Sequence, residues 1–451
     1  MERKIIRISI IMPLYNASRY LRETLDSVLK QTFMDFELIC VDDASTDATM
    51  EILLEYQIWD SRIRILCNTE RHGAAYSRNR GMEEAVGEYF AFLDGDDIFE
   101  EEMFETAYRT ASEHEADLVM YEYQHVASDS VYNKLKVFHS EQYTERYCTK
   151  PFTVLDHEPY EFLNWGLGPW NKLYKREVIE QNQLAFQELP CSNDVYFVCM
   201  AMMLSKRMLS LNDDRVMVYV RDHDEPTRIS ADRDPMCCYQ ALWQIAVELK
   251  NRGLFAELCP YFYYRFLKAI RSTLRQCRTE EKEMEFYQFL QQEGIGRIRS
   301  ISGEFYDRLD DYVRNSVEQF EKLDCHTRWY RKELGLKMEL SQKCNAQEVI
   351  RLFMEYGDAH KAIGIWGVGA NGSSLLEFCR EHNLKVDMVV DKSEKKQGCI
   401  VEGYPVKPPE EIDGRLQAII VTTRHICDSV RNEVAGWNIE VIDVNQFLRV
   451  Y

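Results

Sequence analysis

The sequence has little of what marks membrane-spanning, secreted or nucleic-acid-binding proteins. No apolar run among its 451 residues approaches the roughly 20 residues that a membrane-spanning helix needs. Residues 5–12 are too short, and too soon followed by Pro13, to form a signal peptide, so we read them as a strand. Acidic residues outnumber basic ones, 75 to 55, and the formal net charge of −20 argues against a nucleic-acid partner. We therefore expect a cytoplasmic protein.

Zinc-binding sequence patterns are also missing. The 14 cysteines include no C-x-x-C pair, and the chain has no H-E-x-x-H motif, which leaves little support for a zinc site. Without a signal peptide, we expect the cysteines to be reduced thiols. The composition, 45% hydrophobic and 29% charged, is that of a folded protein, and the length suggests about three domains.

Hydrophobic patterning divides the chain into three regions. Residues 1–124 alternate strand and helix patterns, which predicts a mostly parallel sheet with helices on both faces. Residues 125–230 are less regular, residues 235–356 read as helices, and the strand–helix alternation returns after residue 361. We predict an α/β protein with an N-terminal domain at 1–230, a helical domain at 231–356 and a small Rossmann-like domain at 357–451.

Aspartates gather at the ends of the predicted strands. Residues 42–47 (Asp-Asp-Ala-Ser-Thr-Asp) follow the second strand, and residues 94–97 (Asp-Gly-Asp-Asp) follow the fourth. Ligands of open parallel sheets bind beyond the carboxyl ends of the strands, so we expect both groups at one site. Clustered carboxylates repel one another, and a divalent cation removes that conflict. The pattern therefore indicates Mg²⁺ or Mn²⁺ together with a diphosphate-containing substrate.

Four motifs, taken in order, resemble those of the family 2 glycosyltransferases with the GT-A fold. They are residues 8–16, which end in Pro-Leu-Tyr-Asn, residues 41–47, residues 72–81 (His-Gly-Ala-Ala-Tyr-Ser-Arg-Asn-Arg-Gly) and residues 92–97. Each motif is weak alone, whereas all four at compatible spacing are specific. The resemblance covers about residues 5–230. It implies that a sugar moves, with inversion, from a UDP-sugar to a hydroxyl group, with the help of Mn²⁺ or Mg²⁺.

The resemblance also implies functions for individual positions. Pro13 and Tyr15 would frame the base, and Asp43 would accept a hydrogen bond from its imide N–H. Asp96, with Asp97 beside it, would bind ribose and the metal. The positions implied for the nucleotide-sugar are Pro13, Tyr15, Asn16, Asp43, Ser45, Arg78, Asp94 and Asp96. Helix capping remains an alternative for residues 42–47, and a surface ion pair remains one for Arg78.

The acceptor side is read from residues 192–197, which resemble the family's Glu-Asp motif. Asp194 matches this motif and is the predicted general base, while Asn193 stands where the family usually has Glu. An acid that interacts with the dipole of the following helix is the alternative for Asp194. The acceptor or lid candidates, for which core packing or solvated loops are the alternatives, are Trp170, Asn193, Arg221, His223 and Arg228.

Residues 261–278 form the one locally basic segment. Spacings of 3, 3, 4 and 3 place on one helical face Arg265, Lys268, Arg271, Arg275 and Arg278. This face predicts either peripheral contact with the inner face of the cell membrane or a solvated, ion-paired helix. A 4-3-4-3 apolar rhythm over residues 309–323 indicates either self-association into a homo-oligomer or a core helix of a bundle.

The C-terminal region carries G-x-G-x-x-G after a predicted strand. Gly367, Gly369 and Gly372 stand at a helix start, and Asp391 ends the next predicted strand. This is the arrangement of a dinucleotide-binding fingerprint, although the region has only about half the length of a full dinucleotide domain. A second nucleotide site and a vestigial docking module both remain open.

Together these patterns predict a glycosyltransferase of the hexosyltransferase type in cell-surface glycan synthesis. Its acceptor would be a glycan, a lipid-linked oligosaccharide or a glycoprotein. Two alternatives stay open: a bifunctional chain whose C-terminal domain is an NAD-dependent sugar-nucleotide modifier, and a non-catalytic sugar-nucleotide-binding scaffold. Asn193 favours the scaffold, whereas the clustered acids argue against it.

Overall fold

The chain folds into two compact units, residues 1–321 and 322–451, which we describe separately. In this computed structural model the described residues are 5–126, 137–141, 150–211, 216–221, 234–277, 279–322, 352–354, 356, 361–368, 370–381, 384–393, 396–401, 403–412, 415–422, 427–434, 436–437 and 439–443. None of the described helices combines the length and apolar character that crossing a bilayer requires.

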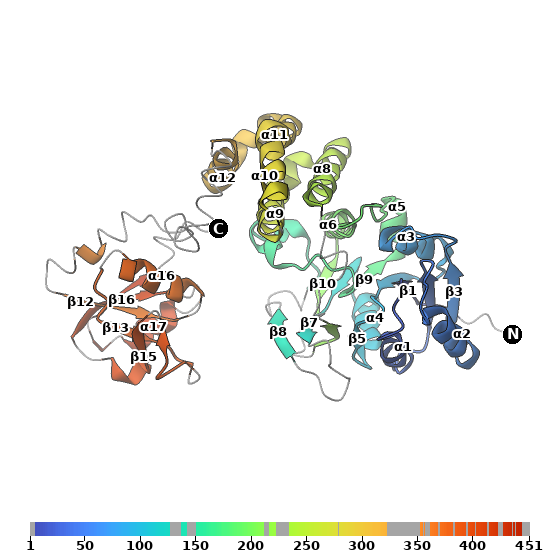
Figure 1. Cartoon of the computed structure of the whole chain (residues 1–451), viewed down its shortest axis with the longest axis horizontal. Coiled ribbons are helices and arrows are strands. Elements are labelled where there is room, and N and C mark those ends of the chain that lie inside the picture. Colours follow the sequence, from blue (N-terminus) through green and yellow to red (C-terminus); the bar gives the residue numbers. More distant parts are fainter. Residues whose placement is uncertain are drawn as a thin grey trace. The chain divides into compact units, whose positions relative to one another are not determined.

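A seven-stranded sheet organises the first unit (Figure 1). Its strands, in spatial order, are β10 (Met208–Ser210), β6 (Leu118–Met120), β9 (Lys172–Lys175), β4 (Tyr89–Phe92), β1 (Ile8–Leu14), β2 (Phe36–Asp42) and β3 (Ile63–Cys67). All are parallel except β9, which runs antiparallel to both β4 and β6. The strands β1 and β2 are apolar and almost wholly buried, as a sheet covered on both faces requires.

Helices connect and cover these strands. They are α1 (Leu21–Leu29), α2 (Thr49–Trp59), α3 (Ala74–Glu84), α4 (Met103–Glu113), α5 (Arg176–Gln181) and α6 (Val195–Leu204). In α1 the apolar residues recur every three to four positions and form the buried face, which fixes how the helix lies on the sheet. α6 is apolar all round and nearly every residue is buried, so it is a central helix of the unit.

A smaller sheet lies beyond the strand that carries the aspartate motif. Its order is β5 (Ile98–Phe99), β11 (Val218–Arg221), β7 (Tyr123–Val126) and β8 (Val137–Glu141). β5 follows Asp97 directly and pairs antiparallel with β11. This pairing brings residues 120 positions apart in the sequence beside the aspartates.

The helical region belongs to the same compact unit as the large sheet. It comprises α8 (Pro235–Asn251), α9 (Phe255–Gln276), α10 (Glu280–Phe289), α11 (Ile295–Ser302) and α12 (Asp311–Lys322). Asp234 caps α8 by accepting from the Met236 N–H, and Pro235 occupies its first turn.

The basic face predicted on α9 is not a free surface throughout. Arg265 is 4% exposed and donates to the carbonyls of Phe162 and Trp165, and Lys268 donates to the Leu163 carbonyl at 2.6 Å. The prediction of a membrane-contacting face is therefore wrong for Arg265, whose charged group is buried against the protein's own backbone, whereas Lys268 is exposed and the prediction stays open there.

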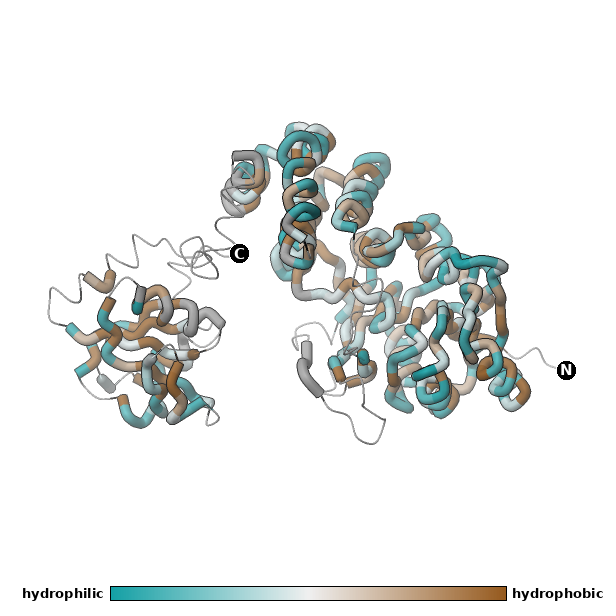
Figure 2. Tube along the Cα trace, viewed as in Figure 1, coloured by the Kyte–Doolittle hydropathy of each residue, from teal (hydrophilic) through white to brown (hydrophobic). Residues whose placement is uncertain are grey.

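The second unit is an open α/β sheet. Its order is β14 (Ile400–Val401), β15 (Tyr404–Lys407), β13 (Met388–Val390), β12 (Ala362–Trp366), β16 (Leu416–Val421) and β17 (Glu440–Asp443), with α16 (Ala370–Glu381) and α17 (Cys427–Glu433). All neighbours are parallel except β14 and β15. Figure 2 shows these strands as a hydrophobic centre. The predicted fold class is confirmed: an α/β N-terminal part, helices in the middle and a C-terminal α/β sheet.

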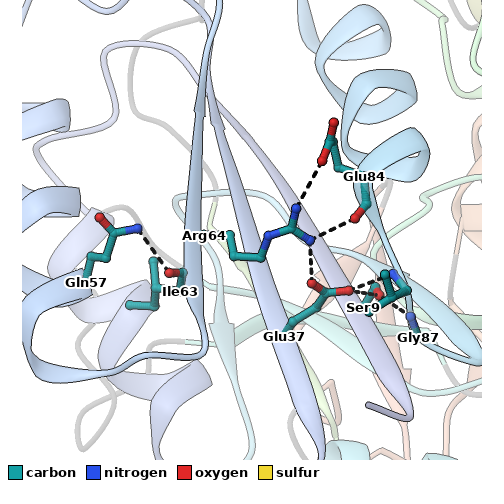
Figure 3. A network of polar contacts seen from close by, with 8 residues as sticks. Ser9, Glu37, Gln57, Ile63, Arg64, Glu84 and Gly87 are labelled. Atoms are coloured by element: carbon teal, nitrogen blue, oxygen red, sulfur yellow. Dashed lines mark hydrogen bonds and ion pairs between the residues drawn. The ribbon is translucent and has the colours of Figure 1, made fainter. Parts of the chain in front are cut away.

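An ion pair between buried Glu37 and partly exposed Arg64 joins the amino ends of the first unit's central strands (Figure 3). Glu37 on β2 accepts from the Ser9 hydroxyl at 2.6 Å and the Val86 N–H at 2.8 Å, and it pairs with Arg64 on β3 at 2.7 Å. Ser9 in turn accepts from the Gly87 N–H. The network therefore joins β1, β2, β3 and the turn before β4 at the edge opposite the aspartates.

We expect Glu37→Gln to lower the free energy of unfolding by about 1–2 kcal/mol, because it removes the charge that faces Arg64 and one acceptor of a buried network. Denaturant unfolding measures this loss. Glu84→Gln is the control, since Glu84 pairs with the same arginine but its side chain is 53% exposed, and its loss should stay below about 0.5 kcal/mol. Equal losses in the two variants would contradict the importance of burial here.

Candidate functional site

The carboxyl edge of the large sheet brings all four motifs into contact, each with at least one of the others. Asn16, which follows β1, adopts a φ of 50° and accepts from the Thr46 N–H at 2.8 Å. Its own N–H donates to the Ser45 hydroxyl at 3.0 Å. Asn16 and Ser45, two of the residues predicted for the nucleotide-sugar, therefore join the loop after β1 to the loop after β2 by hydrogen bonds. Asp47 joins the same lock by accepting from the Ser18 and Thr49 N–H groups.

Asp43 is buried and organises a third loop. Its two carboxylate oxygens accept from the Asn68 amide at 2.7 Å and from the N–H groups of His72 at 2.9 Å and Gly73 at 2.7 Å. Gly73 has a φ of 96°, which favours glycine and turns its N–H toward the acid. A carboxylate has about four acceptor positions, so these three bonds leave capacity for one more donor. The predicted contact to a base imide N–H fits that remaining capacity.

The base-framing residues lie at the same edge. Pro13 is in β1 opposite Val41 of β2, and Tyr15 follows with 38% of its surface exposed. The Arg71 guanidinium covers the Tyr15 ring at 4.1 Å from its centre. The sequence motifs did not identify Arg71 or Asn68, because neither residue belongs to one of them. The folded loop brings Arg71 to Tyr15 and Asn68 to Asp43.

Arg78 joins the donor motif to the acceptor motif. Its guanidinium pairs with Asp94 at 2.8 Å and donates to the Asn193 side-chain oxygen at 3.4 Å, and it lies over the Phe186 ring. The Arg78 side chain is 7% exposed, so the surface ion pair considered from the sequence is wrong. Arg78 thus contacts a residue 115 positions away in the sequence.

Asp94, Asp96 and Asp97 crowd their charges into a small volume. Burial raises the pKa of Asp94 and is helped by the charge of Asp96, while Arg78 opposes it. Burial and the charges of Asp96 and Asp94 raise the pKa of Asp97 well above its usual range. Asp97 is 2% exposed and accepts from the Arg221 N–H at 3.0 Å. Bringing a cation to this turn would lower the electrostatic cost that both shifts report.

Arg221 lies behind this turn and not in a surface loop. Its guanidinium donates to the Asp96 carbonyl at 2.9 Å, pairs with Glu23 at 2.7 Å and covers the Tyr20 ring at 4.5 Å. The side chain is 1% exposed. The prediction that Arg221 closes over a diphosphate is therefore corrected: β11 holds it buried, where it supports the Asp96–Asp97 backbone. The two other lid candidates, His223 and Arg228, lie outside the described residues.

The acceptor motif sits at the start of α6. Asp194 occupies the N-cap position but makes no side-chain cap hydrogen bond to the helix, and Ser192 just before it has a φ of 54°. Asp194 is partly exposed, while Asn193 beside it contacts Arg78. Asp194 is thus the sequence neighbour of Asn193, which contacts Arg78, and Arg78 in turn pairs with Asp94. Trp170 is partly buried and packs edge-on against Tyr123, with ring centres 4.6 Å apart.

The donor set fits a divalent cation of the magnesium type. Hard carboxylate oxygens are present on Asp94, Asp96 and Asp97. Burial is the main cause that raises the pKa of Asp94 and Asp97, and the neighbouring carboxylates add to it. Across the part of the chain that the structure describes, no group of three or more His, Cys, Asp or Glu side chains is arranged to hold a metal. Proteins usually bind Mg²⁺ through one or two carboxylates, with substrate phosphates as further ligands. The aspartates here therefore fit Mg²⁺ when a substrate supplies the remaining ligands.

The glycine motif of the second unit is used for close packing. A Cβ on Gly372 would clash with the Gly367 carbonyl, which also accepts from the Thr422 hydroxyl at 2.8 Å. Asp391 accepts from the N–H groups of Val368 and Ser393, both at 2.8 Å, and pairs with Lys396. Burial opposes these bonds, yet they lower the pKa of Asp391. Gly369 lies outside the described residues. The acid therefore fixes the loop after β12, which weakens its assignment to a ribose.

Comparison with known proteins separates the two units. Residues 9–182 match the family model described as glycosyl transferase family 2. Residues 332–433 match a different model, the C-methyltransferase C-terminal domain, and not the dinucleotide-binding family that the glycine motif suggested.

Curated relatives align with parts of this chain. Glycosyltransferase GlyG of Streptococcus pneumoniae is 42% identical over 116 residues, which cover 26% of this chain and 38% of GlyG. Uncharacterized glycosyltransferase EpsJ of Bacillus subtilis is 31% identical over 225 residues, or 49% of this chain and 63% of EpsJ. The match to poly(ribitol-phosphate) beta-N-acetylglucosaminyltransferase TarS of Staphylococcus aureus is 27% identical and covers 41% of that protein. The chain thus spans less than two thirds of each of these relatives.

Solved structures agree on the fold. The crystal structure of S. aureus TarS 1–349 in complex with UDP-GlcNAc superposes with a TM-score of 0.59 at 22% sequence identity, covering 73% of this chain and 92% of that one. The coverage reaches past the family 2 match, so the relation in fold includes part of the helical region.

We expect Asp97→Asn to raise the unfolding temperature at neutral pH in EDTA by several degrees, or about 1–2 kcal/mol. A raised folded-state pKa means that the protonated acid favours the fold and that this stability is lost as pH rises. The gain from asparagine should therefore grow from pH 5 to pH 8. Thermal melts across that range measure it.

Asp47→Asn is the matched control with the opposite sign. Burial raises the pKa of Asp47, but hydrogen bonds from Ser18 and Thr49 outweigh it and lower the pKa. The wild-type stability from this acid exists above its unfolded pKa and is lost as pH falls. The variant should be less stable at neutral pH, and its deficit should shrink in acid. If the unfolding temperatures of Asp97→Asn and Asp47→Asn shifted in the same direction relative to wild type, the electrostatic account would be contradicted.

Proposed function

We propose that this chain is a glycosyltransferase that moves a sugar from a UDP-sugar to a hydroxyl group of a bacterial cell-surface polymer. The observation that carries the proposal is Arg78, which holds Asp94 of the donor motif and Asn193 of the acceptor motif together. Support for the donor comes from the UDP and UDP-GlcNAc complexes of TarS, and support for the acceptor comes from the poly(ribitol-phosphate) named for that relative.

The residues divide the reaction between two sides of the site. On the donor side, Tyr15 and Asp43 receive the base, and Asp94 and Asp96 accept from the ribose hydroxyls, while the diphosphate would bind through the divalent cation. On the acceptor side, Asp194 takes the proton of the attacking hydroxyl at a carboxylate oxygen. Attack from the side opposite the departing diphosphate gives inversion at the anomeric carbon. Asn193 keeps Arg78 in place without adding a second acid beside Asp94.

Asp96 and Asp97 would hold the divalent cation. Such an ion supplies charge stabilisation to the departing diphosphate. Arg221 contributes from behind by fixing the carbonyl of Asp96 and the carboxylate of Asp97. A turn held in this way presents its carboxylates without a conformational change when substrate arrives.

The donor test measures nucleotide release from a panel of UDP-, dTDP- and GDP-sugars with Mn²⁺, Mg²⁺ or EDTA. We expect metal-dependent release from a UDP-sugar, and Asp96→Asn should weaken UDP binding with Mn²⁺ about tenfold or more, since a charged contact is lost. Asp35→Asn, an exposed acid at the opposite edge, is the control and should behave as wild type. Absence of both release and UDP binding would remove the proposal.

The base test separates chemistry from binding. Asp194→Asn should lower the rate of release by about 10²–10⁴-fold, the usual contribution of a general base, while calorimetric UDP affinity stays within about twofold. A variant that retains the wild-type rate would exclude Asp194 as the base. A variant that loses UDP affinity would assign Asp194 to donor binding instead.

A further inference from the structure

Two buried cations hold one segment of the chain, residues 162–170, which lies at the edge of the proposed site. The first is Lys172, the first residue of β9, with an exposed fraction of 0%. Its ammonium donates to the carbonyls of Gly166 and Gly168, both at 2.8 Å, and to the Asn171 side-chain oxygen at 2.7 Å. An ammonium has three donors, so these three bonds use its whole hydrogen-bonding capacity.

The second cation reaches the same segment from the helical region. Arg265 of α9 donates to the carbonyls of Phe162 and Trp165 and lies over the Phe162 ring at 4.6 Å. Two neighbours on the same helix face add to it: Tyr261 donates to the His157 carbonyl at 2.7 Å, and Lys268 donates to Leu163. Spacings of four and three residues align these side chains along one face of α9.

Strand register places this segment at the carboxyl edge with the aspartates. β9 runs antiparallel between β4 and β6, so its first residue lies where those two strands end. Lys172 is opposite Met120, the last residue of β6, and Leu173 is opposite Ala91 of β4. The residues before β9 therefore stand at the edge from which β4 leads into Asp94. Trp170 extends the segment toward β7 by its contact with Tyr123.

We propose that Lys172 and Arg265 are positioning residues that fix residues 162–170 as the acceptor-side wall of the site, an inference that rests on the proposed function. Carbonyl groups that bind a buried ammonium or guanidinium are held in one orientation, because releasing them would leave a desolvated charge. The wall is thereby shaped before an acceptor arrives. The helical region contributes to catalysis through α9 without touching the reacting atoms.

Hydrogen–deuterium exchange of the full chain tests the holding function without any substrate. In Lys172→Met, amides of residues 160–171 should exchange about tenfold faster or more, since three hydrogen bonds are lost, while residues 43–47 exchange as in wild type. Lys175→Met on the same strand is the control, because Lys175 is partly exposed and its ion pair to Glu177 is 3.9 Å long. Unchanged exchange at 160–171 would overturn the proposal.

Kinetics test whether the held segment serves the acceptor. With the UDP-sugar identified above, Lys172→Met should keep UDP affinity and release to water within about twofold. Transfer to 4-nitrophenyl glycosides should fall about tenfold or more through the acceptor KM. Parallel losses of UDP affinity and transfer would assign Lys172 to general stability and overturn the acceptor assignment.

A second variant covers the case in which Lys172→Met does not fold. Lys268→Ala removes one partly exposed donor to the same segment, and it should accelerate exchange at 160–171 about two- to threefold. Unchanged exchange in this variant would overturn the contribution of α9. A wild-type chain that releases no nucleotide from any sugar would refute the proposed function, and the exchange data would then still decide whether the cations hold the segment.

Discussion

The whole site depends on the electrostatic repulsion among three aspartates on one short turn. Asp97 is buried and Asp94 and Asp96 are partly buried, and the neighbouring carboxylates help burial to raise the pKa of Asp94 and Asp97. Two arginines oppose this repulsion from different directions: Arg78 pairs with Asp94 on one side, and Arg221 holds the backbone and carboxylate of the turn on the other. Every other motif at this edge connects to that turn directly or through one residue.

Burial of the arginines explains why the connections are so specific. A guanidinium that is 7% or 1% exposed has little access to water, so the partners of its terminal nitrogens lie inside the protein, although the buried Nε of Arg78 has no hydrogen-bond partner. Arg78 thereby ties α3 to the start of α6, and Arg221 ties β11 to α1 through Glu23. The polar contacts that serve substrate also serve as the joints between elements far apart in the sequence.

The sequence predicted the elements well and the contacts less well. Strand ends at Asp42 and Asp94 were visible because apolar runs stop there, and this was enough to bring the acids to one edge. Arg221 was misread because a basic residue followed by Asp222 and His223 resembles a polar loop, and only its pairing with Asp97 shows that β11 is buried. Arg265 was misread for a similar reason: helical spacing indicates a face but does not say what covers it.

Lys172 illustrates what patterns of residue type leave out. Lysine at the start of a strand is common in sequences, and its three acceptors, on Gly166, Gly168 and Asn171, all precede it without forming a recognised motif. Its importance comes from zero exposure, a property of the packed molecule. Sequence reasoning found Trp170 in the same segment because aromatic residues near sugar sites attract attention, whereas the group that shapes the segment is a cation beneath it.

The hydrogen bonds from α9 to residues 157–165 limit where a functional fragment of this chain can end. The family 2 match stops at residue 182, yet Tyr261, Arg265 and Lys268 donate to carbonyls that precede it. A truncation before α9 would leave those carbonyls without their donors and would unbind the segment. A chimaera that exchanges the catalytic region with a relative would therefore have to include α9, since residues 157–165 depend on donors that lie outside the matched motifs.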